Sequence, residues 1–407
     1  MKRKLSFLLA MVLMLSTLTN VALAEDAKAL NTTVETTKAT IEATVETENK
    51  VLELSMDEAV KLATENDRGM WKIDDGIKQA QDARKSGKSE KEIAEDMMAA
   101  KLGDPLSLEE AYYMNNYVSA LLAKNGYYIT LADTQMKQLE KSRELLVKGI
   151  EIEAKSLYYS VLLAEKAIEI NNAKLVKSNE QLRVVNLKFN SGSATKAEVL
   201  NAEMAVQQTK TELDSAMDDL NMSKLDLLNK LDLSFDQEIS LTDKELVYVP
   251  TADIDLNARI EKAKRERPEI LEAENALELQ KIETHAYTAY YTSNLRQHKS
   301  AKEKLKDAEL NVPQAYKNVE LDVRKSYLNL VKAERALVNM DKTVELAKEA
   351  ARINKLLYNN GMATSLDVLD ADTNLAQAEI GRYQLLAAYN ISKLMFDNSN
   401  FIGSGMK

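Results

Sequence analysis

A motif that occurs twice, at a spacing of 169 residues, constrains the fold of this chain more than any other feature. Residues 189–195 read Phe-Asn-Ser-Gly-Ser-Ala-Thr, and residues 358–364 read Tyr-Asn-Asn-Gly-Met-Ala-Thr. The same spacing pairs residues outside the motif, such as Tyr158 with Tyr327. A constant spacing over roughly 75 residues predicts a duplicated unit, in which one helix, a tight turn and a second helix repeat.

The chemistry of each motif predicts the end of one helix joined to the start of the next. Gly192 and Gly361 stand where a residue must become left-handed, which glycine does without a Cβ penalty. Three residues later, Thr195 and Thr364 are expected to be N-caps. The acids that complete a capping box at the third helical position are Glu198 and Asp367. Each motif therefore predicts an antiparallel helical hairpin, although any one of these residues could serve only to end or begin a helix.

The helices on either side of the motifs are predicted to be long. From Val319 to Tyr358 the apolar residues fall at alternating steps of four and three, interrupted only by Ser326 and Asn354. A repeat of 3.5 residues is typical of left-handed coiled-coil packing. A helix of ~40 residues would be about 60 Å long. The expected fold class is therefore mainly α, with two tandem repeats of long coiled-coil hairpins.

The first 50 residues differ in composition from the rest of the chain. Residues 1–24 combine a basic start, a short apolar stretch and a small-x-small ending, which predicts a signal peptide and export from the cytoplasm. Residues 25–50 are rich in Thr, Glu, Ala and Lys and are expected to be a disordered leader. The chain has no cysteine, which excludes a lipid-anchored cysteine and disulfides. Its net charge of −10 argues against binding of nucleic acid.

The remaining chain divides into two halves. We expect a first repeat over 51–241, a linker over 242–256 around Pro250, a second repeat over 257–400 and a tail over 401–407. The opening helices of the two halves align with an offset of 200 rather than 169. The first half therefore carries 31 extra residues between its opening helix and its long helix.

Several of these motifs together resemble the TolC family of outer-membrane efflux proteins. The resemblance includes the Leu-Ser-x-x-Glu-Ala opening at residues 54–59 and the Arg-Pro-Glu-Ile sequence at residues 267–270. The tip motif, an aromatic followed by x-x-Gly-x-x-Thr and then x-x-Asp-Val-Leu-x-Ala, fits best at residues 358–371. The match spans most of residues 52–400.

The resemblance implies a function in transport. In this family three chains close a twelve-helix tube, usually joined to an outer-membrane β-barrel, and the helical tips dock on a periplasmic membrane-fusion adaptor. An inner-membrane pump supplies the energy, so that the tube is a passive exit duct for efflux or type I secretion. The resemblance thus implies a homotrimer in the outer membrane and periplasm. It places adaptor docking at the hairpin tips, which carry Gly192, Thr195, Gly361 and Thr364.

The resemblance also implies a constriction near the tips. Asp367 and Asp370 fall where family members place inward-facing carboxylates, and a ring of such acids would attract cations. The alternative for Asp367 is its capping role, and for Asp370 a solvated surface position. Ala194 and Ala363 stand where some members carry charged latch residues, so a salt-bridged gate is not implied here.

The sequence departs from the family in the windows where barrel strands should lie. Residues 283–308 are rich in lysine and offer one short strand candidate at residues 287–292. In the first half, residues 117–132 could form a β-hairpin that turns at Gly126. The alternative is a helix broken at Gly126, which we favour. The β-barrel strands are therefore expected to be short or absent. The alternative function is a barrel-less helical spacer of the envelope that conducts nothing.

Half of the tyrosines fall within these windows. They suit either an interfacial aromatic belt, which would allow membrane association, or ordinary packing at helix ends. These residues are Tyr112, Tyr113, Tyr117, Tyr127, Tyr128, Tyr287, Tyr290 and Tyr291.

Catalytic motifs do not appear in the sequence. The two histidines, His285 and His298, are thirteen residues apart without a metal-binding pattern around them. Gly87-Lys88-Ser89 resembles the end of a phosphate-binding loop, but Asp82 occupies the position of the first glycine. We therefore expect no enzyme activity, no metal site and no cofactor.

Overall fold

The computed structural model describes residues 51–101, 104–251, 254–401 and 403. The predicted signal peptide over 1–24 and leader over 25–50 lie outside the described residues. The tail over 401–407 lies outside them as well, except for Phe401 and Gly403.

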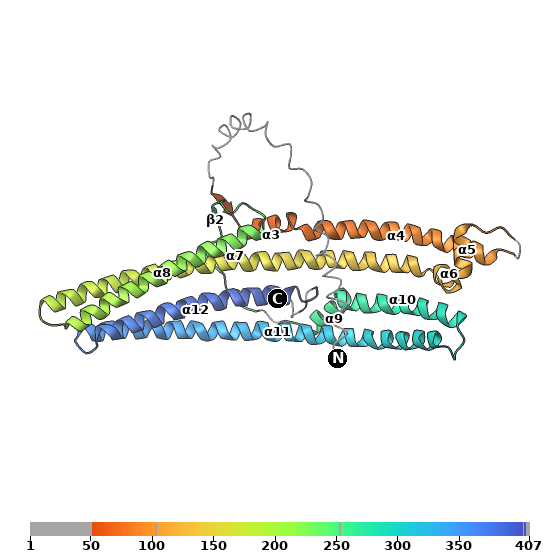
Figure 1. The fold of residues 1–407 in the computed structure, drawn as a ribbon. Helices are drawn as coiled ribbons and strands as arrows, with labels where there is room; N and C mark the ends of the chain where they lie inside the picture. The colour runs from red at the N-terminus through yellow and green to blue at the C-terminus, as the bar shows by residue number, and fades with distance from the viewer. Residues whose placement is uncertain (1–50, 102–103, 252–253, 402, 404–407) are drawn as a thin grey trace, which may run out of the picture. The chain divides into compact units, whose positions relative to one another are not determined.

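Two helical hairpins form the largest part of the fold (Figure 1). The first joins α7 (Tyr127–Asn190) to α8 (Lys196–Lys230), and the second joins α11 (Arg296–Asn359) to α12 (Ser365–Asp397). α7 and α11 are each 64 residues long, which corresponds to about 96 Å. α12 packs along α7 as well as along α11, so the contact between α7 and α12 joins the two hairpins.

A second set of helices packs along the other end of each long helix. In the first half these are α3 (Met56–Glu65) and α4 (Arg68–Ala99), which contact α7. In the second half they are α9 (Leu256–Glu266) and α10 (Pro268–Tyr290), which contact α11. Each long helix therefore takes part in two antiparallel pairs, one towards each of its ends.

Most of the extra residues of the first half that the structure describes are helical. α4 has 32 residues where α10 has 23, and two short helices follow it, α5 (Leu108–Asn115) and α6 (Tyr117–Lys124). The described strands are β1 (Leu52–Leu54) and β2 (Ile239–Leu241). They pair in parallel, with Leu52 opposite Ile239, and bring the start of the first half beside its end.

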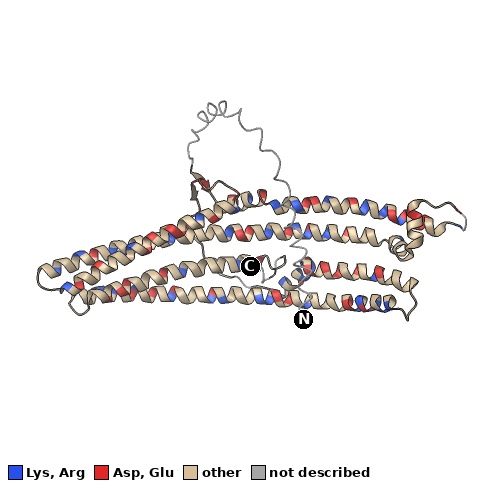
Figure 2. Ribbon diagram, in the orientation of Figure 1, with Lys and Arg blue, Asp and Glu red and all other residues tan. Residues whose placement is uncertain are grey.

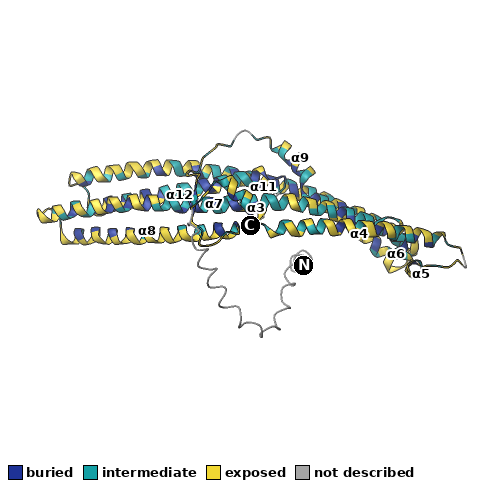
Figure 3. Cartoon of the chain, turned by 90° about the horizontal axis from the view of Figure 1, so that it is seen from above, coloured by how far each residue is buried: buried dark blue, intermediate teal, exposed yellow. Residues whose placement is uncertain are grey.

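The coiled-coil pattern predicted from Val319 is confirmed by burial along α11. Val319, Val323, Leu330, Leu337 and Val344 are all buried. The remaining members of the series are buried or half-buried, and none is exposed. Figure 3 shows the same division on the other long helices, with buried residues between helices and exposed residues on the outer faces.

The windows in which strands were sought are helical. Residues 283–308 contain the end of α10, a short turn and the start of α11. Gly126 lies between α6 and α7 with a φ of 76°. The interpretation as a broken helix is therefore confirmed, and the β-hairpin alternative is wrong. None of the described helices is both long enough and apolar enough to span a membrane.

Candidate functional site at the hairpin tips

Both hairpin turns have the backbone geometry that the motif predicts. Gly192 and Gly361 have φ values of 75° and 74°, in the left-handed region. The N–H of Ser193 donates to the carbonyl of Lys188 over 2.7 Å, and the N–H of Met362 donates to the carbonyl of Leu357 over 2.8 Å. These bonds, with one from each glycine N–H to the carbonyl three residues earlier, form the Schellman motif that ends a helix.

The helices that leave the turns begin with complete capping boxes. The Thr195 hydroxyl accepts a hydrogen bond from the Glu198 N–H, and the Glu198 carboxylate accepts one from the Thr195 N–H. Thr364 and Asp367 make the same exchange, over 3.2 and 2.7 Å. Hydrogen bonds from the Thr364 backbone and then from its hydroxyl lower the pKa of Asp367 below 3.8. The carboxylate of Asp367 therefore caps α12 in its ionised form.

An apolar cluster holds the two tips together. It buries side chains from all four hairpin helices: Val185, Val199, Ala202, Tyr358 and Val368. Ala194 and Ala363 pack against it from the two turns. The two turn positions at Ala194 and Ala363 therefore belong to an apolar contact in this chain.

Two cationic contacts also join the hairpins near the tips. The Lys188 ammonium lies 3.6 Å from the centroid of the Tyr358 ring and donates to the Tyr358 carbonyl over 3.4 Å. Lys177 of α7 pairs with Asp372 of α12 over 2.9 Å. No motif in the sequence marks Lys188, Lys177 or Asp372. The repeat alignment does distinguish Lys188 and Lys177 from their surroundings. Their counterparts in the second half are Leu357 and Leu346, which have no charge.

The structure brings the two turns together and leaves the predicted site residues exposed on them. Gly192, Thr195, Gly361 and Thr364 are exposed at the turns. Asp370 is also exposed, one turn after Asp367 along α12. A single chain therefore presents the acids at its surface.

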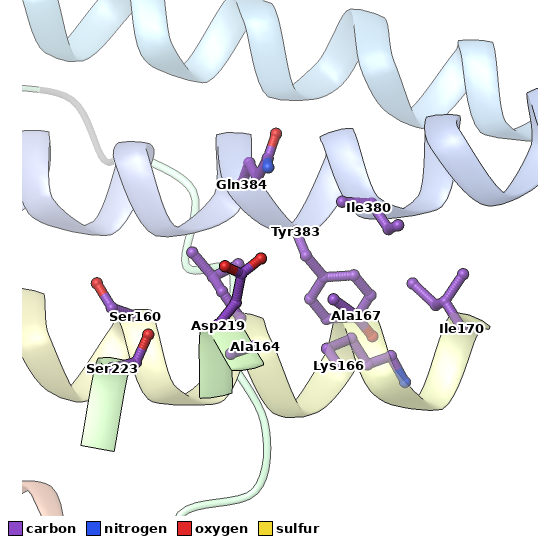
Figure 4. Close-up of a pocket in the computed structure, with 11 residues that line it drawn as sticks. Ser160, Ala164, Lys166, Ala167, Ile170, Asp219, Ser223, Ile380, Tyr383 and Gln384 are labelled. Atoms are coloured by element: carbon purple, nitrogen blue, oxygen red, sulfur yellow. The ribbon is translucent and has the colours of Figure 1, made fainter. Parts of the chain in front are cut away.

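A small cavity lies between the helices farther from the tips. Its volume is about 220 Å³, and residues of α7, α8 and α12 line it. Tyr383 of α12 points towards α7 (Figure 4), and the Lys166 ammonium lies 5.1 Å from the centroid of its ring. Burial lowers the pKa of Lys166, but hydrogen bonds to Glu169 and Tyr383 outweigh burial and raise it. No group of three or more potential metal ligands occurs within the described ranges.

Comparison with known proteins connects this arrangement to outer-membrane channels. The outer membrane efflux protein family matches residues 291–394, which include α11, the second tip and most of α12. No curated protein matches the sequence.

Solved structures share the fold over nearly the whole chain. One is a membrane protein from Pseudomonas aeruginosa, with 14% identity, a TM-score of 0.65, and coverage of 87% of this chain and 91% of that one. The outer membrane protein VceC from Vibrio cholerae has 14% identity, a TM-score of 0.58 and coverage of 86% and 96%. The outer membrane channel CmeC from Campylobacter jejuni has 12% identity, a TM-score of 0.57 and coverage of 95% of each chain. The resemblance drawn from the sequence is thereby confirmed: residues 291–394 match the outer membrane efflux protein family, and the chain as a whole shares the fold of outer-membrane channels.

Proposed function

We propose that this chain is the channel component of a tripartite efflux or type I secretion system. Three copies form a tube in the cell envelope, at the outer membrane and periplasm, and the tube is a passive exit duct. The hairpin tips, with Gly192, Thr195, Gly361 and Thr364, dock on a membrane-fusion adaptor, which an inner-membrane pump engages. Residues 51–241 and 257–400 are the two repeats of each copy, joined by a linker at 242–256. The matching family and the shared fold support this proposal.

The observation that carries the proposal is the contact between α7 and α12, whose counterpart between α11 and α8 is not among the extended helix contacts of the described residues. α12 packs along α7 and joins the two hairpins. The spacing of 169 residues relates α7 to α11 and α12 to α8. If the repeats are equivalent, α11 of one copy packs on α8 of the next copy in the same way. Repetition of this contact leads to a closed ring of equivalent helices.

Exposure of apolar side chains agrees with such a contact between copies. On α12, Leu369 is 7% exposed, whereas its counterpart Leu200 on α8 is 47% exposed. On α7, Lys177 pairs with α12, whereas its counterpart Leu346 on α11 is 61% exposed. Large apolar side chains that stay exposed at the positions of an internal contact indicate an interface with another chain.

The association can be tested by light scattering on the mature protein, in mild detergent and in plain buffer. We expect a trimer for the parent chain. Leu200→Glu together with Leu346→Glu places unpaired charges in the proposed interface and should weaken association roughly tenfold or more. The matched control is Val338→Glu. Val338 is 52% exposed on α11, but its counterpart is the exposed Glu169, outside the internal contact.

A parent chain that stays monomeric in both solutions would contradict the proposal. Equal loss of association in the control and in the paired variant would show that the chosen face is wrong.

A second candidate is a helical spacer of the envelope that binds a partner and conducts nothing. The helical structure of residues 283–308 favours it. Conductance across planar bilayers distinguishes the two functions, because only the channel component would give stepwise ion currents.

A further inference from the structure

The end of α7 that lies farthest from the tip carries a surface of unusual composition. Two segments form it: residues 111–132, from α5 through the start of α7, and residues 284–302, from the end of α10 to the start of α11. We call these two segments the tyrosine end. Because α7 is continuous over 64 residues, about 96 Å separates this end from the tip.

The tyrosine end has no acidic residue, although the chain as a whole is acidic. Asp and Glu make up 64 of the 407 residues and give a net charge of −10. The two segments together hold 41 residues, none of them Asp or Glu, and half of the 16 tyrosines. The cations in the two segments are Lys124, Arg296, Lys299 and Lys302. At the average frequency of acids, about six would be expected in a stretch of this length.

Contacts between the two segments make them one surface. α6 and α7 both pack against α10. The rings of Tyr117 and Tyr290 have centroids 5.8 Å apart, and the side chains of Asn125 and His285 are hydrogen-bonded over 3.2 Å. Segments that are about 170 residues apart in sequence therefore share one end of the helical unit.

Apolar and aromatic side chains of this surface are exposed together with its cations. Five large side chains are exposed by 41–59%: Tyr112, Met114, Tyr117, Tyr290 and Leu295. The four cations are exposed as well. The start of α11 contributes three of them within seven residues, and Figure 2 shows basic residues at this end of the helix.

The acids nearest to this surface flank it rather than lie within it: several have partners of their own, and Glu303, next to Lys302, is exposed. Glu90 of α4 accepts a hydrogen bond from the Tyr113 hydroxyl over 3.3 Å, and Glu283 pairs with Lys304 over 3.2 Å. Glu110, in the first turn of α5, is held in a capping box with Ser107. Glu109 lies beside it, just outside the tyrosine end.

We propose that the tyrosine end docks on the surface of an anionic lipid bilayer. Tyrosine favours the boundary between lipid and water, since its ring is apolar and its hydroxyl is polar. Lysine and arginine beside such rings are attracted to anionic headgroups, and exposed apolar side chains enter the boundary region. Docking in this way leaves the tips free to face away from the bilayer. The inference relies on the proposed function only for a location in the cell envelope.

Vesicle sedimentation with the mature chain tests the proposal. We expect the protein to bind vesicles that contain phosphatidylglycerol and phosphatidylcholine, and to bind phosphatidylcholine vesicles at least tenfold less tightly. Salt should weaken the binding, because it screens exposed charges.

A charge-removal variant identifies the surface. Arg296→Gln, Lys299→Gln and Lys302→Gln together should weaken binding to the anionic vesicles roughly 100-fold. The matched control removes three exposed lysines near the tip end of α11: Lys342→Gln, Lys348→Gln and Lys355→Gln. The control should bind as the parent does. Tyr290→Ser with Leu295→Ser should reduce the binding that remains at high salt, and circular dichroism shows whether each variant keeps its helices.

Three results would overturn the inference: no binding to anionic vesicles, equal loss of binding in the control, or binding to a soluble polyanion but not to vesicles. None of them depends on the trimer, because the oligomeric mass is measured separately. Vesicle binding by a monomer would support the docking surface and contradict the proposed tube. A trimer that does not bind vesicles would support the tube and contradict the docking surface.

Discussion

At the scale of single residues, the capping threonines and the buried arginine show two kinds of side-chain contact. The capping boxes of Thr195 and Thr364 follow from residue types three positions apart, and the structure contains both. The environment of Arg267 could not be predicted in the same way. Its side chain is fully buried and paired with Glu269 and Asp322, and Asp322 is 55 residues away on α11. A charged residue is seldom buried, so only the three-dimensional packing shows where its partners are.

The stability of the fold should depend on pH through Asp367, because hydrogen bonds from Thr364 lower the pKa of this carboxyl. A depressed pKa means that the charged form stabilises the fold above that pH, and that this contribution is lost as the pH falls through the folded value. Asp367→Asn should therefore melt at a lower temperature than the parent at about pH 7. The difference should shrink as the pH falls through the folded pKa of Asp367, because the parent carboxylate then becomes protonated.

Thermal melts followed by circular dichroism across this pH range provide the measurement. Asp218→Asn, which removes an exposed acid from the middle of α8, controls for loss of a charge. A difference that persists unchanged at low pH would mean that the carboxylate does not act through its charge.

At the scale of elements, the hairpin turns are the part of the fold that the sequence specifies most completely. The repeated motif predicted the glycine conformation, the caps and the antiparallel direction, and all three are present. The secondary structure of the two tyrosine-rich segments, residues 111–132 and 284–302, is harder to predict. Tyrosine and threonine favour strands, while the alanines favour helix. Packing against α4, α7 and α11 decides these windows in favour of helix. The spacing of Ser107 and Glu110 is itself a helix-start signal in the sequence, and the two residues form the capping box that begins α5.

Two glycines with equal space around them provide a test of the turn geometry. An added Cβ meets nothing within 4 Å at Gly361 or at Gly149, so only the backbone conformation distinguishes the two sites. Gly361→Ala forces alanine into the left-handed region and should lower the free energy of unfolding by about 1–2 kcal/mol. Gly149→Ala lies inside α7 and should raise it by about 1 kcal/mol.

Denaturant unfolding at fixed protein concentration measures both changes. The opposite signs are the essential result, and a stabilising effect of Gly361→Ala would mean that the turn does not need a left-handed residue.

At the scale of the whole molecule, the two hairpins are joined by the contact between α7 and α12. The contact between α7 and α12 could not be predicted from the sequence, because the contact residues differ between the repeats. Lys177 and Asp372 form an ion pair in this contact, whereas their counterparts are Leu346 and Glu203. The internal contact is therefore partly ionic, and the equivalent face, which we propose binds another copy, has Leu346 in place of the lysine.

The predicted constriction belongs to the proposed trimeric tube, and a substitution at Asp370 tests it. Asp370 is exposed and lies outside the capping box, so its replacement should leave the fold intact. If copies of Asp370 line the narrow end, Asp370→Asn should reduce the preference for cations over anions several-fold. The reversal potential across a planar bilayer, under a gradient of potassium chloride, measures this preference, and Asp218→Asn is the control. An unchanged reversal potential in Asp370→Asn would place the constriction elsewhere.

The equal length of α7 and α11 limits how a gene for such a chain can change. Both helices have 64 residues, and their C-terminal ends pack into one apolar cluster. A deletion of seven residues in only one of them would keep the coiled-coil register but would offset the two turns by about 10 Å. That offset would break up the cluster that joins Val185 to Tyr358. Insertions and deletions in these helices should therefore survive in evolution only as matched heptads in both halves.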